Sequence, residues 1–202
     1  MRISLGSCSP HTDGFSTTLM RPTARKNRKI IVNIATSADG YIARPNHDIA
    51  WLTSRPAPKG FYGMGTFMRS IDTTLLGRKT YDVSLRLGAT FNRHYVFSRQ
   101  QPPASVPTGV EFINGAITAF ANRLKHERGK NIWMMGGGDI IASFLDEGAI
   151  DEFIISIVPI FIGEGIPLIA PRHRHVPLQL HSVKHYPDGV VQVHYGVGNA
   201  GR

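Results

Sequence analysis

The sequence predicts an α/β fold with a mostly parallel central sheet, helices on both faces and an antiparallel hairpin at the carboxyl-terminal end. Short apolar, often β-branched runs alternate with segments of helical periodicity up to about residue 158. The last two apolar runs are instead joined by the Tyr-Pro-Asp-Gly turn at residues 186–189, which is typical of a hairpin. The length of 202 residues fits one domain, and no internal repeat is present.

Strands are expected where an apolar run ends at glycine, proline or another turn residue. They are expected at residues 29–35, 73–76, 93–97, 110–113, 131–135, 153–158, 178–184 and 190–195. Helices are expected where apolar residues recur every three or four positions, at residues 61–70, 79–87, 116–127 and 139–147. Residues 44–60 lack such periodicity and indicate a long loop around Trp51, of the kind that often carries function.

Positive charge is concentrated at the amino-terminal end of the chain. The formal net charge is +9, and residues 1–29 carry +5 of it, which leaves +4 for the rest. We interpret residues 1–28 as a disordered basic tail and residues 29–202 as the folded domain. Nucleic-acid contact, an organelle transit peptide and a true start at Met20 are alternatives for the tail. The domain lacks the basic-aromatic interleaving of single-strand readers, so we expect no nucleic-acid partner.

Composition narrows the setting in which the protein works. Hydrophobic residues make up 42% of the chain, as in globular proteins, but no apolar run reaches the ~18 residues that span a bilayer. The single cysteine, Cys8, excludes an internal disulfide framework, so we expect a cytoplasmic protein without a membrane partner. His173 and His175 alternate in a basic loop that has no carboxylate nearby, so no metal site is expected.

Three turns carry candidate ligand chemistry, and each follows a predicted parallel strand, where open α/β sheets bind ligands. Residues 77–80, Gly-Arg-Lys-Thr, open a helix whose free N–H groups suit a phosphate. Residues 136–138 are three glycines that let a ligand approach the backbone, although they form neither a dinucleotide fingerprint nor a P-loop. Ser98 and Arg99 suit the 2′-phosphate that distinguishes NADPH from NADH. A solvated basic turn, a flexible linker and an ordinary surface arginine are the alternatives.

Seven motifs follow one another over roughly residues 29–196. They are Ile34-Ala35, Asp39-Gly40-Tyr41-Ile42-Ala43, Trp51-Leu52, Gly77-Arg78-Lys79-Thr80-Tyr81, Ser98-Arg99, Gly136-Gly137-Gly138 and Gly163-Glu164-Gly165-Ile166-Pro167-Leu168. This order resembles the dihydrofolate reductase superfamily, in particular bacterial members related to the reductase domain of the bifunctional riboflavin-biosynthesis deaminase-reductase. The resemblance implies a dihydrofolate-reductase-like fold, NADPH as cofactor without metal or flavin, and a homodimer.

The resemblance also implies a path for the cofactor across the sheet. Ala35 and Ile42 would flank the nicotinamide. Gly77, Arg78, Lys79 and Thr80 would bind the pyrophosphate side, with Arg78 near the adenosine phosphate, and Ser98 and Arg99 would meet the 2′-phosphate. Gly136, Gly137, Gly138 and Ile140 would pack against the diphosphate and the nicotinamide ribose.

The candidate catalytic residues that the resemblance implies are Asp39, Trp51, Ser156 and Glu164. Each has a plainer alternative: a cap on the Asp-Gly turn, loop packing, an ordinary strand residue and a loop carboxylate, in that order. Folate reductases carry a carboxylate on the first helix, where this chain has Phe61, and no acid lies between Asp48 and Asp72.

The activity expected from these motifs is hydride transfer from NADPH to a small heterocyclic or carbonyl substrate. It is similar to that of the riboflavin-biosynthesis 5-amino-6-(5-phosphoribosylamino)uracil reductase domain, whose substrate phosphate Arg44, Arg55 or Lys59 could meet. True dihydrofolate reduction and a catalytically silent NADPH-binding protein are the alternatives, and the missing carboxylate makes dihydrofolate an expected poor substrate.

Overall fold

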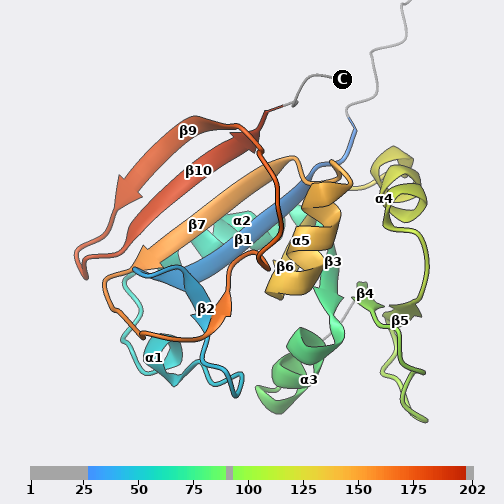
Figure 1. Ribbon diagram of the computed structural model, residues 1–202, viewed down its shortest axis with the longest axis horizontal. Coiled ribbons are helices and arrows are strands. Elements are labelled where there is room, and N and C mark those ends of the chain that lie inside the picture. The colour runs from blue at the N-terminus through green and yellow to red at the C-terminus, as the bar shows by residue number, and fades with distance from the viewer. Residues whose placement is uncertain (1–26, 90–92, 199–202) are drawn as a thin grey trace, which may run out of the picture.

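The computed structural model describes residues 27–89 and 93–198. A central sheet of eight strands has the order β5-β4-β3-β6-β1-β7-β10-β9 (Figure 1). Its strands are β1 (Ile30–Ser37), β3 (Ile71–Gly77), β4 (His94–Phe97), β5 (Val110–Ile113), β6 (Asn131–Gly136), β7 (Glu152–Val158), β9 (Leu178–His185) and β10 (Val191–Val197). The first six strands in this order pair in parallel, whereas β10 is antiparallel to both β7 and β9. The predicted fold class, a mostly parallel α/β sheet with an antiparallel carboxyl-terminal hairpin, is therefore confirmed.

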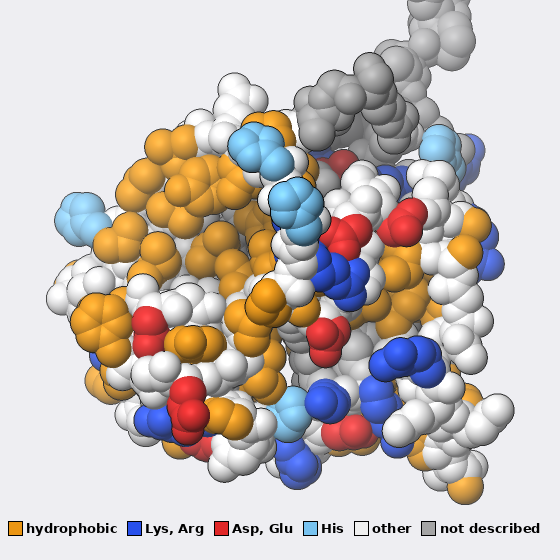
Figure 2. All heavy atoms as spheres, in the orientation of Figure 1, with side chains coloured by type: hydrophobic (Ala, Val, Ile, Leu, Met, Phe, Trp, Pro, Cys, Tyr) orange, Lys and Arg blue, Asp and Glu red, His pale blue; other side chains and the backbone are white. Residues whose placement is uncertain are grey.

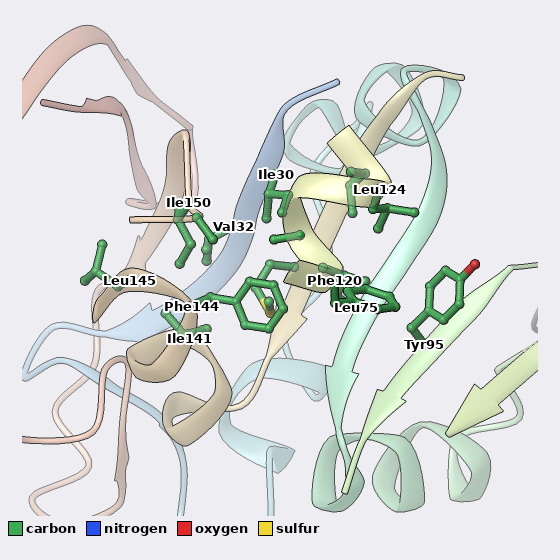
Figure 3. Close-up of a cluster of buried hydrophobic side chains, with 14 of the residues drawn as sticks. Ile30, Val32, Leu75, Tyr95, Phe120, Leu124, Ile141, Phe144, Leu145 and Ile150 are labelled. Atoms are coloured by element: carbon green, nitrogen blue, oxygen red, sulfur yellow. The ribbon is translucent and has the colours of Figure 1, made fainter. Parts of the chain in front are cut away.

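Helices α4 (Ile117–His126) and α5 (Gly138–Asp146) cover one face of the sheet. Phe120 of α4 and Phe144 of α5 both make edge-to-face ring contacts with Phe97, at centroid distances of 5.2 and 5.1 Å. Figure 3 shows these helical side chains pointing at the strand residues Ile30 and Leu75, which are fully buried. This is the main hydrophobic core, and it fixes the strands whose ends form the site.

The opposite face carries α2 (Met64–Arg69) and α3 (Arg78–Arg86). Because side chains alternate along a strand, Leu76 points away from the core that holds Leu75 and packs with Tyr81 of α3. Trp133, next to the core residue Met134, likewise meets Phe67 of α2 edge to face at 5.7 Å. The helices therefore lie on both faces, as predicted.

Two features inside the predicted loops escaped the sequence analysis. The loop around Trp51 contains the single-turn helix α1 (Ala50–Thr53), and a small second sheet pairs β2 (Tyr41–Ala43) with β8 (Ile166–Pro167). These two strands are too short to show an apolar pattern, and their partners lie far apart in the chain. The pairing brings the loop after β7 against the turn after β1, beside the ends of the parallel strands.

The amino-terminal boundary of the domain lies before Arg28, one residue earlier than expected. Arg28 is 3% exposed, forms an ion pair with Asp72 and donates to the hydroxyl oxygen of Thr73 at 2.7 Å. Of the rest of the predicted tail, Asn27 is described, whereas residues 1–26 lie outside the described residues. In the part of the chain that the structure describes, no helix has the length and apolar character needed to traverse a bilayer.

Candidate functional site

A cleft of about 1390 Å³ opens along the carboxyl ends of the parallel strands. Residues from or just after β1, β3, β4, β6 and β7 line it, among them Ala35, Gly77, Ser98, Gly137 and Ser156. Figure 2 shows Lys and Arg side chains gathered at the lower right of this face, over the region of α3, β4 and β5. The strand ends where the sequence placed its three ligand turns thus share one cavity.

The structure brings most of the predicted cofactor residues to the cleft. Those that line it are Ala35, Ile42, Gly77, Arg78, Lys79, Thr80, Ser98, Arg99, Gly137, Gly138 and Ile140. Gly136 does not line it and instead ends β6 directly behind the cleft wall. Residues from several separate sequence motifs therefore lie together along one cleft.

The first two predicted turns, each of which opens a helix, touch one another. A Cβ placed on Gly137 would lie 3.3 Å from Thr80 Oγ1 and 3.8 Å from Ile42 Cδ1. On Gly77, it would lie 3.6 Å from Ile140 Cγ2. The amino-terminal ends of α3 and α5 are therefore adjacent, and their free N–H groups are the donors that an anion at a helix start uses.

Each of the three glycines at residues 136–138 has its own structural reason. Gly136 has φ of 120°, which other residues rarely adopt, and the Gly136–Gly137 peptide is cis. Gly137 has φ of −80°, so its backbone suits other residues and only the space toward Thr80 is limited. A Cβ on Gly138 would lie 2.3 Å from the Pro167 carbonyl oxygen, so this glycine allows β8 to pack on α5.

The basic residues at one end of the cleft differ in how they are engaged. Arg78 pairs with Asp82 at 3.0 Å and stacks over the Phe112 ring at 5.3 Å. Within residues 27–89 and 93–198, no ion pair involves Lys79 or Arg99. Both side chains are exposed at the cleft, so they are the cations most available to an anionic ligand.

Of the candidate catalytic residues, only Ser156 lines the cleft. It is 8% exposed and its hydroxyl accepts a hydrogen bond from the Gln192 amide at 3.0 Å. Glu164 is exposed on the loop before β8, outside the cleft lining. Trp51 is 7% exposed and packs with Val158 and Val190, as the loop-packing alternative expected.

Asp39 has a structural role that crosses the chain. Its carboxylate accepts the backbone N–H of Gly163 at 2.7 Å and that of Ile162. A hydrogen bond from the Ser37 hydroxyl, together with these backbone bonds, holds the pKa of Asp39 below its usual value. The carboxylate therefore ties the turn after β1 to the loop before β8, in addition to its bond with Ser37 in its own turn, and it does not line the cleft.

Among the cleft residues that the sequence did not mark as catalytic candidates, Arg55, Tyr62 and Gln192 stand near Ser156 or Asp188 through hydrogen bonds. Asp188 accepts from the Tyr62 hydroxyl and from the backbone of Val190, and Arg55 donates to the Asp188 carbonyl at 2.9 Å. Burial and the bond to Asp188 raise the pKa of Tyr62. These residues come from three separate segments, so no local motif marks them. Arg44 and Lys59, the other predicted phosphate ligands, do not line the cleft.

The backbone that carries Tyr62 is unusual. The four residues 60–63 all have positive φ, at 83°, 43°, 53° and 78°, and the middle two are Phe61 and Tyr62. Non-glycine residues in this region cost about 1–3 kcal/mol each and cluster at functional sites. The segment delays the predicted helix, which begins at Met64, and leaves Phe61 54% exposed in the cleft.

Comparison with known proteins places these features in a wider group. The family model described as the RibD C-terminal domain matches residues 110–192, which include the three glycines and Gln192. YwjB, an uncharacterized protein of Bacillus subtilis, is 38% identical over 172 residues, covering 83% of this chain and 97% of its own length.

Solved structures share the fold. A putative riboflavin biosynthesis protein from Shewanella is 30% identical with a TM-score of 0.74, covering 85% of this chain and 99% of that one. A deaminase/5-amino-6-(5-phosphoribosylamino)uracil reductase from Thermotoga maritima is 16% identical with a TM-score of 0.64, covering 86% of this chain and 57% of that one. The second likeness concerns the fold alone.

Proposed function

Because the chain belongs to the RibD C-terminal-domain family and has its dihydrofolate-reductase-like fold, we propose that it is an NADPH-dependent reductase. It would transfer a hydride to a small heterocyclic or carbonyl substrate. The nicotinamide supplies the chemistry when the cofactor is bound, while the chain supplies position, exclusion of water and a route for the proton.

One observation carries the proposal: the amino-terminal ends of two helices and two basic side chains without a described ion pair line a single cleft. The starts of α3 and α5 meet at Thr80 and Gly137, where their N–H groups suit a diphosphate. Lys79 and Arg99 line the same cavity without an ion pair to another described residue. An elongated ligand with a diphosphate and a terminal phosphate matches this distribution of donors and charge.

The other part of the cleft suits an uncharged polar substrate group. Ser156 and Gln192 are hydrogen-bonded to each other, and the Gln192 amide also donates to the Tyr62 carbonyl oxygen at 3.3 Å. The same cleft is also lined by the apolar side chains of Phe61, Trp133 and Val190. Few polar groups in an apolar lining are typical of small-molecule sites. Arg55 lines the cleft and is the candidate contact for a substrate phosphate.

Dihydrofolate is expected to be a poor substrate. Among the described residues that line the cleft, the only carboxylates are Asp82, which pairs with Arg78, and Asp139 at the start of α5. Neither lies near Ser156 along the sheet, and Phe61 occupies the chain position of the folate enzymes' carboxylate. In folate reductases this carboxylate helps to protonate the pterin, and general acid assistance typically accelerates a proton transfer about 10²–10⁴-fold.

The test is a screen of NADPH oxidation against dihydrofolate, the ribosylaminouracil phosphate and a panel of small carbonyl compounds. We expect turnover with a member of the last two classes. Gln192→Leu should lower this turnover while leaving the Kd for NADPH unchanged, because Gln192 lies at the substrate end. Binding of NADPH without oxidation by any compound would contradict an enzyme and favour a silent cofactor-binding protein. Efficient dihydrofolate reduction, at about 10⁴ M⁻¹s⁻¹ or more, would favour true dihydrofolate reductase.

A further inference from the structure

Three side chains of the metal-ligand type meet on the sheet, away from the cleft. Glu152 begins β7, His194 lies in β10 and His181 lies in β9, so they come from three adjacent strands. Each offers one ligand atom, and these atoms all lie within 4.8 Å of one another. None of the three lines the cleft, and Glu152 lies at the opposite end of β7 from Val158, which does.

A β-bulge brings His181 into this group. His194 lies opposite Ser182, and the next residue of β10, Tyr195, lies opposite Leu180, so His181 is the extra residue of β9. Bulges of this kind re-aim a side chain. The His181 ring consequently packs against the His194 ring, with centroids 5.0 Å apart and planes at 78°.

Gly196 provides the space that the His181 ring occupies. It lies directly opposite Glu152 in the β7–β10 pairing, and a Cβ placed on it would be 2.7 Å from His181 Nε2. Its φ is outside the left-handed region, so the backbone itself does not require glycine here. A glycine within a strand often marks a close approach, and here the approaching group is an imidazole.

The carboxylate is held in a fixed orientation. Glu152 has a side chain that is 10% exposed, and its Oε1 accepts a bond from the Lys29 ammonium. Its Oε2 lies 3.0 Å from His194 Nε2, on the side of the two imidazoles. A second hydrogen bond of this kind is how proteins orient a ligating carboxylate. The hydrogen-bond contact between Glu152 and His194 accounts for these two residues, but it does not account for the bulge and the glycine that bring His181 to them.

We propose that Glu152, His181 and His194 form a divalent-metal site of the zinc type, with water as the remaining ligand. Two imidazole nitrogens and one carboxylate oxygen are a donor set that Zn²⁺ accepts. His181 is exposed, which gives the metal a path and leaves room for water. A bound ion would fasten the β9–β10 hairpin to β7 and would stabilise the folded chain by mass action. This inference does not rest on the proposed reductase function.

The test uses the tag-free full chain after treatment with a chelator, at neutral pH. Calorimetric titration with Zn²⁺ and visible spectra with Co²⁺ should show one saturable equivalent and a rise in Tm. His181→Gln and His194→Gln should each weaken binding by at least about tenfold, and His181 is exposed enough for its replacement to leave the fold intact. His185→Gln, on the same strand, is the matched control and should bind as the unchanged chain does.

Gly196→Ala tests the geometry of the site without removing any of the three ligands. It keeps all three ligands but moves the His181 ring off the site, so Zn²⁺ binding should weaken as in His181→Gln. Zn²⁺ affinity that is unchanged in His181→Gln and His194→Gln, absent saturable binding, or equal weakening by His185→Gln would each overturn the proposal.

Discussion

At the scale of single residues, neighbouring glycines beside the cleft have different roles: Gly137 concerns cofactor binding, whereas Gly138 concerns folding. Gly137 has an ordinary backbone conformation, whereas its neighbour Gly136 has a positive φ. What restricts Gly137 is the space between Thr80 and Ile42. Gly138 is restricted by the Pro167 carbonyl oxygen, which belongs to the fold rather than to the cleft.

Gly137→Val is therefore expected to weaken NADPH binding more than it lowers stability. The new side chain would enter the space at the meeting point of α3 and α5, where Thr80 Oγ1 is 3.3 Å from the added Cβ. Calorimetric titration gives the affinity and urea unfolding gives the stability. Gly138→Ala is the comparison and should mainly destabilise. A folded Gly137→Val protein with normal NADPH affinity would make this turn only a linker.

His94 predicts a pH dependence of stability. Burial lowers its pKa from 6.5 to about 4, so the folded chain holds the imidazole neutral where the unfolded chain protonates it. The folded state binds fewer protons below pH 6.5, and its free energy of unfolding should fall as the pH drops from about 6.5 toward about 4.

Urea unfolding over this pH range should show a smaller fall for His94→Asn than for the unchanged chain. His175→Asn, at an exposed loop position, is the control and should keep the full dependence. Parallel curves for the unchanged chain and His94→Asn would contradict the assigned role.

At the scale of elements, sequence patterns predicted what is local and missed what depends on distant partners. The eight strands of the main sheet were expected within a few residues, because each carries its own apolar run between turn residues. Strands β2 and β8 were missed because their pairing joins segments that lie more than a hundred residues apart. The cleft shows the same division.

Glycine and basic turns marked the proposed cofactor end from sequence, because each turn is a local pattern. Gln192 and Tyr62 at the substrate end have no local signal, because they lie 130 residues apart in the chain and meet only in the folded structure, where the Gln192 amide donates to the Tyr62 carbonyl oxygen. Asp39 and Glu164 belong to recognisable motifs, yet both lie outside the cleft lining.

The segment that enters β1 gives a prediction about the domain boundary. Arg28 is buried against Asp72, Thr73 and the Lys130 carbonyl oxygen. Its loss leaves the Asp72 carboxylate without its cation and the two oxygens without their hydrogen-bond donor. We expect Arg28→Ala to lower the free energy of unfolding by about 2–4 kcal/mol, less than a fully buried pair because Asp72 is partly exposed.

Two shortened chains and one substitution test this boundary by urea unfolding. A chain beginning at Asn27 should be as stable as the full chain, whereas a chain beginning at Lys29 should show the loss expected for Arg28→Ala. Arg69→Ala, which removes an exposed arginine of α2, is the control. Equal stability of the two shortened chains would show that Arg28 contributes little.

At the scale of the whole molecule, part of one face of the sheet, at the edge strand β9, is left exposed. Leu178, Leu180 and Val183 of β9 are 47–54% exposed. The ladder partners of the first two, Val197 and Tyr195, pack against the main core. Figure 2 shows hydrophobic side chains gathered at the upper left, over β9 and β10. An apolar patch of this kind marks an interaction site, and a second copy of the chain is the partner expected from the family resemblance.

The expected homodimer should separate when this face is made polar. Light scattering coupled to size exclusion should give a dimer mass for the unchanged chain and a monomer mass for the double variant Leu180→Asp with Val183→Asp. Phe161→Asp, which alters a 79% exposed side chain on a loop, should leave the dimer intact. A monomer at all concentrations for the unchanged chain would remove this expectation.

The central claim is that the cleft binds NADPH, and calorimetric titration of NADPH and NADH tests it most directly. Lys79 and Arg99 are free of described ion pairs, and a charge-assisted contact is worth roughly 1.5–3 kcal/mol, so NADPH should bind about ten- to a hundredfold tighter than NADH. Arg99→Ala should remove most of this difference without changing NADH binding, and Arg69→Ala should change neither affinity. Equal affinities for the two cofactors in the unchanged chain, or no saturable binding of either one, would contradict the account.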